Sequence, residues 1–258
     1  MAFIQCSFHS HVLGIASSMN VVLPEREDLG ERRPFPCLFL LHGLSDDHTI
    51  WCRRTSIERY AEERGIAVVM PAGGRGFYVD NAAGPRWGSF VADEVPAVAH
   101  SLFPLSERRE DTFIAGLSMG GYGAFRIALA HPQRFAAAGS FSGALDMARR
   151  PENPDPDWTV ELTRIFGDLA TMPGSANDLF EQARRSSPAD RERLRLFQCC
   201  GTEDFLYDAN VRFRDHARSL GLALTYEEGP GTHEWEYWDA AVQRFLDWLG
   251  LPRRTQPD

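Results

Sequence analysis

Gly116-Leu117-Ser118-Met119-Gly120 is the stretch that decides how this chain folds. It follows the apolar run Thr112-Phe113-Ile114-Ala115 and precedes a run of small and apolar residues, 121–131, that is typical of a helix. This is the G-x-S-x-G pattern in its strand-turn-helix context, where a sharp turn lifts a serine hydroxyl off the edge of a sheet. Glycine is needed on either side because strand and helix pass close together there. The pattern predicts Ser118 as a nucleophile and the amide of Met119, at a helix N-terminus, as a donor to an oxyanion.

Apolar runs that alternate with helical patterns indicate how the rest of the chain is organised. The expected strands lie at residues 19–23, 37–41, 66–70, 112–115, 135–141, 194–200 and 222–226, with a loop at 24–36. The expected helices lie at residues 56–64, 91–102, 121–131, 209–220 and 235–249. Strands that alternate with helices form parallel β-α-β units with right-handed crossovers. The sequence therefore predicts the α/β class, as one domain over residues 1–258 with helices on both faces of a mostly parallel central sheet, and with its site at the carboxyl ends of the strands.

Residues 146–190 interrupt this alternation. The segment contains five prolines, and its apolar residues are gathered in two islands at 158–166 and 179–180. Loops that follow strands at the carboxyl edge of a parallel sheet often form pocket walls. The segment is therefore predicted to be a cap-like insertion over the strand ends, and the alternative is a surface excursion far from the chemistry.

Composition and charge exclude several classes of function. A net charge of −9 argues against nucleic acid as a partner, because phosphate backbones bind clustered cations. No apolar stretch is long enough to span a membrane, and residues 1–6 lack the features of a secretory signal. The five cysteines are an odd number without metal-ligand spacing, as expected for reduced core thiols. These features predict a cytoplasmic protein with no membrane partner, no metal and no organic cofactor.

A serine hydroxyl becomes a good nucleophile only when a positioned base takes its proton. The best candidate base is His233, in Gly229-Pro230-Gly231-Thr232-His233-Glu234-Trp235, between a strand and the last expected helix. The acid that orients it should follow the preceding strand, where Asp204 lies. Its carboxylate would fix the tautomer of the imidazole. Asp208 is the rival acid, although an N-capping role explains it equally well, and Glu203 is interpreted as a charge at the strand end.

A second oxyanion donor is expected after an earlier strand, because an oxyanion needs two preset backbone amides. His42-Gly43-Leu44-Ser45 follows the strand at 37–41, and Gly43 permits a tight turn. The amide of Leu44 is therefore the predicted partner of the amide of Met119. His42 itself is interpreted as a structural histidine that bonds to the loop backbone.

Taken together, these motifs resemble those of a known family. The chain is similar to the esterase D branch of the α/β-hydrolases, close to the short-chain tributyrin-type esterases and related to the S-formylglutathione hydrolases. The resemblance rests on four stretches spread over most of the chain: LLHGL at 40–44, GLSMGGYGA at 116–124, GTEDFLY at 201–207 and GTHEW at 231–235. It implies the α/β-hydrolase fold, a triad of Ser118, His233 and Asp204, the amides of Leu44 and Met119 in the oxyanion hole, and a small, partly apolar acyl pocket.

Four further residues are expected near that pocket. His48 and Trp51 follow the loop of Leu44, in a stretch that is closer to the tributyrin-type esterases than to the enzymes that act on glutathione thioesters. Tyr78 follows a glycine-rich loop, and a plain surface role is its alternative. Trp158 would reach the pocket from the insertion.

The sequence thus predicts a serine carboxylesterase that hydrolyses short-chain acyl esters of small molecules through an acyl-enzyme. Alternative substrates are the thioester S-formylglutathione and feruloyl or acetyl-sugar esters. A third reading, from another class, is an inactive hydrolase fold that serves as a binding module, against which the intact nucleophile, base, acid and oxyanion glycine argue. The oligomeric state stays open, with a homodimer or homotetramer among the alternatives.

Overall fold

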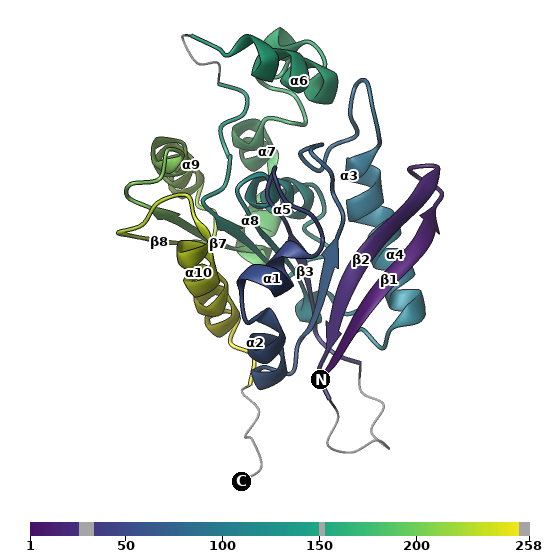
Figure 1. Cartoon of the computed structure of the whole chain (residues 1–258). Helices are drawn as coiled ribbons and strands as arrows, with labels where there is room; N and C mark the ends of the chain where they lie inside the picture. The colour runs from purple at the N-terminus through teal and green to yellow at the C-terminus, as the bar shows by residue number, and fades with distance from the viewer. Residues whose placement is uncertain (26–33, 150–152, 253–258) are drawn as a thin grey trace.

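Eight strands form one mixed sheet in the part of the chain that the computed structural model describes, residues 1–25, 34–149 and 153–252 (Figure 1). Their order across the sheet is β1-β2-β4-β3-β5-β6-β7-β8. Neighbouring strands from β4 to β8 run parallel, whereas β2 pairs antiparallel with both β1 and β4. The strands are β1 (Ala2–Ser10), β2 (Ile15–Leu23), β3 (Cys37–Leu41), β4 (Ala67–Pro71), β5 (Thr112–Leu117), β6 (Ala137–Phe141), β7 (Arg195–Gly201) and β8 (Leu224–Gly229).

The helices connect these strands and cover the sheet. They are α1 (Ile50–Arg54), α2 (Ile57–Glu63), α3 (Trp87–Ser89), the π-helical turn η1 (Phe90–Glu94), α4 (Val95–Leu102), the 3₁₀ turn η2 (Arg109–Asp111), α5 (Met119–Ala130), α6 (Pro156–Phe166), the 3₁₀ turn η3 (Leu169–Thr171), α7 (Leu179–Arg185), α8 (Pro188–Arg193), α9 (Tyr207–Ser219) and α10 (Trp235–Trp248). Among the described helices, none combines the length and the apolar character needed to cross a membrane.

Both faces of the sheet are buried, which is why the central strands are continuously apolar. In β3, Phe39 and Leu41 belong to the core on one face, and Leu38 and Leu40 belong to the core on the other. The first core includes residues of α4, α5, α7 and α9, and the second includes residues of α1, α2 and α10 (Figure 1). The predicted α/β class, with helices on both faces of a mostly parallel sheet, is confirmed.

Two edge strands differ from the expectation. Strand β1 has no continuous apolar run, because its residues alternate between exposed and half-buried positions at the edge of the sheet. Strand β8 begins later than expected, since Leu222 still donates its amide to Ala217 at the end of α9, and it extends through Glu227 and Glu228, which an edge strand tolerates. Most of the expected loop at 24–36 lies outside the described residues.

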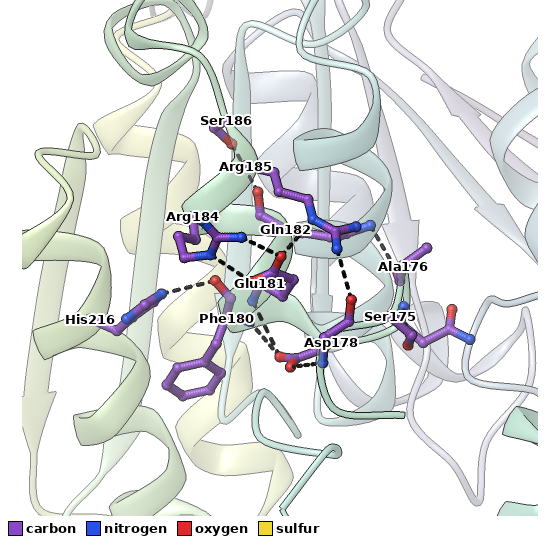
Figure 2. Close-up of polar contacts among 12 residues, drawn as sticks. Ser175, Ala176, Asp178, Phe180, Glu181, Gln182, Arg184, Arg185, Ser186 and His216 are labelled. Atoms are coloured by element: carbon purple, nitrogen blue, oxygen red, sulfur yellow. Dashed lines mark hydrogen bonds and ion pairs between the residues drawn. The ribbon is translucent and has the colours of Figure 1, made fainter. Parts of the chain in front are cut away.

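The insertion at 146–190 is largely helical where it is described. Asp155 begins α6 and Asp178 begins α7, because each carboxylate accepts hydrogen bonds from amides of the first helical turn. Figure 2 shows how α7 is held: Glu181 pairs with both Arg184 and Arg185 on the same helix. These charged contacts order the segment around α7.

Several segments hold the insertion in place, among them α9 and the loop that follows β4. His216 of α9 donates from Nε2 to the carbonyl of Phe180 at 2.9 Å, which joins α7 to the main body (Figure 2). Helix α6, at the top of the view in Figure 1, contacts the loop that follows β4. There Arg75 and Glu161 form a bidentate pair with N–O distances of 2.6 and 2.8 Å. The insertion therefore lies beside a loop that itself borders the candidate oxyanion turn, since Arg75 also donates to the carbonyl of Leu44.

Candidate active site

Ser118 lies in the sharp turn between β5 and α5. Its φ is 50° and its ψ is −115°, a backbone conformation that residues other than glycine rarely adopt. The turn is held from three sides, because Ser118 donates its amide to the carbonyl of Phe141 and its own carbonyl accepts from the amides of Tyr122 and Ala144. The strained residue therefore belongs to a network that leaves its side chain at the carboxyl end of β5.

The glycines around Ser118 are required by close packing. A Cβ on Gly116 would lie 2.5 Å from the carbonyl carbon of Gly120, and a Cβ on Gly120 would lie 2.5 Å from the carbonyl oxygen of Leu41. Backbone atoms cannot yield as side chains do, so neither position accepts a larger residue without a shift of strand or helix. The expectation that strand and helix approach closely at the flanking glycines is confirmed.

A hydrogen-bonded chain joins Ser118 to His233 and Asp204. Oγ of Ser118 lies 3.0 Å from Nε2 of His233, and Nδ1 of His233 lies 2.8 Å from Oδ2 and 3.1 Å from Oδ1 of Asp204. The three residues follow β5, β8 and β7, so the parallel sheet brings them to one edge from positions 115 and 29 residues apart in sequence. With Nδ1 donating to a carboxylate, Nε2 is left free to accept the serine proton.

The loops that carry the acid and the base hold each other. Glu203 accepts a hydrogen bond from the amide of Gly231 at 2.6 Å and donates its own amide to the carbonyl of the same residue at 3.1 Å. A Cβ on Gly201 would lie 2.1 Å from that carbonyl oxygen, which explains glycine at the end of β7. Glu203 is therefore a link between the two loops rather than a free charge at the strand end.

Asp204 is the carboxylate that the structure pairs with His233. Burial alone would raise the pKa of Asp204, but the hydrogen bonds from His233 and from the amide of Leu206 outweigh it and hold the pKa below its usual value. The rival Asp208 lies within the first turn of α9, whose N-cap position is Leu206, so the expected capping role is wrong. Among the described residues, no hydrogen bond joins Asp208 to His233.

The lowered pKa of Asp204 makes a prediction about stability in acid. The ordinary value is 3.8 and the folded value lies below it, so this stabilisation is complete above the unfolded pKa and is lost as the pH falls through the folded pKa. We therefore expect the difference in unfolding free energy between wild type and Asp204→Asn to narrow as the pH falls below 3.8. Urea denaturation of both proteins between about pH 7 and pH 2 measures it, and a constant difference would contradict the prediction.

Two backbone amides are available near Ser118. Within the described part of the chain, no acceptor takes a hydrogen bond from the amide of Met119 or of Leu44. Met119 is the first residue of α5, whose leading amides have no partner inside the helix. Leu44 follows β3, which pairs with β5 in parallel register up to Leu41 and Gly116. The two amides therefore belong to turns at neighbouring strand ends.

His42 stiffens the turn of Leu44, as expected for a structural histidine. Its Nδ1 donates to the carbonyl of Gly43 at 2.7 Å, and its Nε2 accepts from the amide of Gly73 at 2.9 Å. Burial lowers the pKa of His42 to about 4, so the ring is neutral at physiological pH and can accept from Gly73. Tyr78 adds a third constraint, because its hydroxyl donates to the carbonyl of His42 at 2.9 Å.

The four expected pocket residues have different places. Trp51 and Tyr78 are 1% and 0% exposed, so both lie in the core beneath the site and do not line an open pocket. His48 is half-buried next to the turn of Leu44, and its Nδ1 has no hydrogen-bond partner among the described residues. Trp158 lines a cavity of about 130 Å³ in the insertion, together with Met147, Leu162, Leu169 and Met172.

Two aromatic side chains that the sequence did not connect with the site flank His233. The ring of Phe205 lies 4.5 Å from the imidazole centroid, and the ring of Trp238 lies 4.8 Å from it in an edge-on arrangement. Trp238 is 5% exposed and Phe205 is 77% exposed. The position of Phe205 directly after Asp204 was the available signal, but exposure cannot be deduced from that position.

The site combines a hydroxyl, an imidazole and a carboxylate in one hydrogen-bonded chain with two amides that have no described acceptor, an arrangement that suits acyl transfer. Among the described residues, no group of three or more histidine, cysteine, aspartate or glutamate side chains could hold a metal ion.

Comparison with known proteins places these features in context. A family model named Esterase, with the description "Putative esterase", matches residues 10–249. An acetyl esterase from Caldicellulosiruptor saccharolyticus is 28% identical over an alignment 262 positions long, which covers 96% of this chain and 98% of the relative.

Two solved structures from Staphylococcus aureus are also similar, each over 96% of this chain and 98% of the neighbour. One is the substrate-bound fluorophosphonate-binding serine hydrolase F, with a TM-score of 0.87 and 34% sequence identity. The other is the apoenzyme of the S-formylglutathione hydrolase FrmB, with a TM-score of 0.86 and 35% sequence identity. The α/β-hydrolase fold that the resemblance implied is confirmed by this likeness.

Proposed function

The chain belongs to the esterase family whose model covers residues 10–249, and it is a serine hydrolase. From this premise we propose that it hydrolyses short-chain acyl esters of small molecules through an acyl-enzyme on Ser118. One observation carries the proposal: the continuous hydrogen-bonded chain from Ser118 through His233 to Asp204. A serine hydroxyl without such a base is a poor nucleophile, and a histidine without such a carboxylate is not held in the right tautomer.

Acylation follows from this geometry. His233 takes the proton of Ser118 at Nε2 while Oγ attacks the ester carbonyl, and Asp204 stabilises the imidazolium that forms. The amides of Met119 and Leu44 donate to the oxyanion of the tetrahedral intermediate. His233 then gives its proton to the leaving alcohol oxygen as the carbon–oxygen bond breaks, which leaves the acyl group on Ser118.

Deacylation repeats these steps with water as the nucleophile. His233 removes a proton from the water, the same two amides stabilise the second oxyanion, and His233 returns the proton to Oγ of Ser118. The carboxylic acid leaves and the enzyme is regenerated, so the residues already present complete the cycle.

The cavity in the insertion is the candidate site for the acyl group. Its lining residue Met147 lies three residues after Ala144, whose amide bonds to the carbonyl of Ser118. The cavity is small, with a volume of about 130 Å³. We assign this cavity to the acyl group, and its small size restricts that group to a short chain.

A chain-length series tests this assignment. Each methylene that enters the cavity should gain about 0.8 kcal/mol, and methylenes beyond its end should gain nothing and clash with the lining. We expect kcat/KM for p-nitrophenyl esters to peak between acetyl and butyryl and to fall steeply by octanoyl, when measured below micelle-forming concentrations. A maximum at laurate would overturn the assignment.

Trp158 provides the matched variants for that series. Trp158→Ala should enlarge the cavity and move the optimum to longer acyl chains, because the indole is one of its walls. Val160→Ala on the same helix is the control, since Val160 is exposed and does not line the cavity. An unchanged optimum in Trp158→Ala would place the acyl chain elsewhere.

Thioester hydrolysis is the second candidate, because the similarity to the S-formylglutathione hydrolase extends over nearly the whole of both chains. The same nucleophile and oxyanion donors act on either bond, so only the leaving group distinguishes the two reactions. Kinetics with S-formylglutathione, p-nitrophenyl acetate and methyl ferulate side by side would separate them. A kcat/KM for S-formylglutathione far above those for the oxygen esters would make it the better assignment.

Labelling by a fluorophosphonate probe tests whether the site is active at all. The probe captures only an activated serine, so Ser118 should be labelled in the wild type and in Trp158→Ala. An unlabelled wild-type protein would favour the inactive binding module.

A further inference from the structure

Phe205 is the most exposed large apolar side chain among the described residues, at 77%. Phe205 lies in a tight turn, in which Oδ1 of Asp204 accepts a hydrogen bond from the amide of Leu206 at 2.8 Å. A phenyl ring left mostly in water contributes little to folding, because apolar side chains stabilise in proportion to the area removed from water. Its position therefore needs a reason other than core packing.

Phe205 and Trp238 both contact the imidazole of His233, but they differ in their exposure to solvent. Trp238 is almost fully buried against the imidazole at 4.8 Å, and Asp204 is buried against Nδ1. Phe205 contacts the same imidazole at 4.5 Å and is itself open to solvent. Phe205 is therefore the solvent-exposed one of the two aromatic neighbours of His233.

The chemistry brings the leaving group to this place. To receive a proton, the alcohol oxygen must come within about 3 Å of Nε2 of His233. A leaving group at Nε2 is then a neighbour of the same imidazole that the ring of Phe205 contacts. Aromatic and aliphatic leaving groups gain the most binding free energy from contact with a phenyl ring, because apolar surface of both partners is then removed from water.

We propose that Phe205 is a specificity-determining residue, the platform on which the alcohol part of the ester rests during acylation, and that it favours esters of aryl-bearing and other apolar alcohols. This inference deepens the proposed function and rests on it. It concerns the leaving group only, whereas the cavity lined by Trp158 concerns the acyl group.

Esters with one acyl group and different alcohols isolate this effect. Benzyl acetate, cyclohexylmethyl acetate and methyl acetate form the same acetyl-enzyme, so their kcat/KM values differ only in binding and acylation. The three alcohols are all simple primary alcohols, so the ring or cyclohexyl contact is the main difference between them. In the wild type we expect benzyl and cyclohexylmethyl acetate to be preferred to methyl acetate.

Phe205→Ala should lower kcat/KM for benzyl acetate by about tenfold and for methyl acetate by less than about twofold. Phe205→Tyr, which keeps the ring, should restore the benzyl preference. Phe3→Ala is the matched control, because Phe3 is an exposed phenylalanine on the edge strand β1. It should leave all three values unchanged.

Two outcomes would overturn the inference. An equal loss for all three esters, with a shifted pH profile, would mean that Phe205 only shields His233 from water. No loss for any ester would mean that the leaving group lies elsewhere. Failure of the proposed function has a different signature, since the wild type would then hydrolyse none of the acetates. Ser118 would react with a fluorophosphonate probe if the enzyme were a thioester hydrolase, and would not react if the fold were inactive.

Discussion

Replacement of Ser118 by alanine is expected to lower kcat for ester hydrolysis by about 10⁶-fold. In the proposed mechanism the hydroxyl is the group that attacks, and His233 and the two amides cannot form an acyl-enzyme without it. The loss should be as large as removal of the whole triad, because base and acid act only through the nucleophile.

The fold should survive this substitution. The side chain of Ser118 makes one described hydrogen bond, to Nε2 of His233, whereas the turn is held by backbone hydrogen bonds that alanine keeps. We therefore expect a nearly unchanged melting temperature, together with complete loss of fluorophosphonate labelling.

Ser101→Ala is the control for this experiment, since that serine is exposed and its one described side-chain hydrogen bond goes to the carbonyl of Val98 on its own helix. It should leave kcat and labelling unaltered. Wild-type turnover in a pure preparation of Ser118→Ala would rule out the proposed mechanism.

The second large effect is expected for Asp204→Asn, at about 10⁴-fold in kcat. An amide of the same shape can turn its NH₂ group towards Nδ1 of His233, which forces the ring into the tautomer with a proton on Nε2. That tautomer cannot accept the proton of Ser118. The imidazolium also loses the carboxylate that would stabilise it.

Asp208→Asn is the matched control, because Asp208 lies four residues further along the chain, in the first turn of α9. We expect Asp208→Asn to lower kcat by less than about twofold. Loss of the negative charge near the N-terminus of α9 should have only a small effect on stability. A large loss in Asp208→Asn with little loss in Asp204→Asn would show that the wrong carboxylate had been assigned. Asp204→Asn should still bind a fluorophosphonate, but more slowly.

Much of the fold could be predicted because its signals are local. The central strands are buried on both faces, so runs such as 37–41 are continuously apolar whatever surrounds them. The edge strand β1 carries no such run, and its existence depends on pairing with β2. The end of β8 was misplaced for the same reason, because polar residues are tolerated at an edge.

The candidate triad was predictable for a related reason. The turn of Ser118 is made by its own neighbours, and Gly116 and Gly120 are required wherever a strand and a helix approach so closely. The order of strands then brings the ends of β5, β7 and β8 to one edge, since parallel strands carry their carboxyl ends on the same side.

The sequence by itself thus determined the α/β class, the position of the sharp turn at Ser118 and the choice of His233 and Asp204 as its partners. Only the tertiary structure decided which aromatic residues are exposed to solvent. Trp51 is enclosed by Phe141 and Trp235, which are distant in the chain, whereas Phe205 is left in solvent beside His233. Burial is set by contacts between segments far apart in sequence, so a tryptophan near the site becomes core and a phenylalanine next to the acid becomes surface.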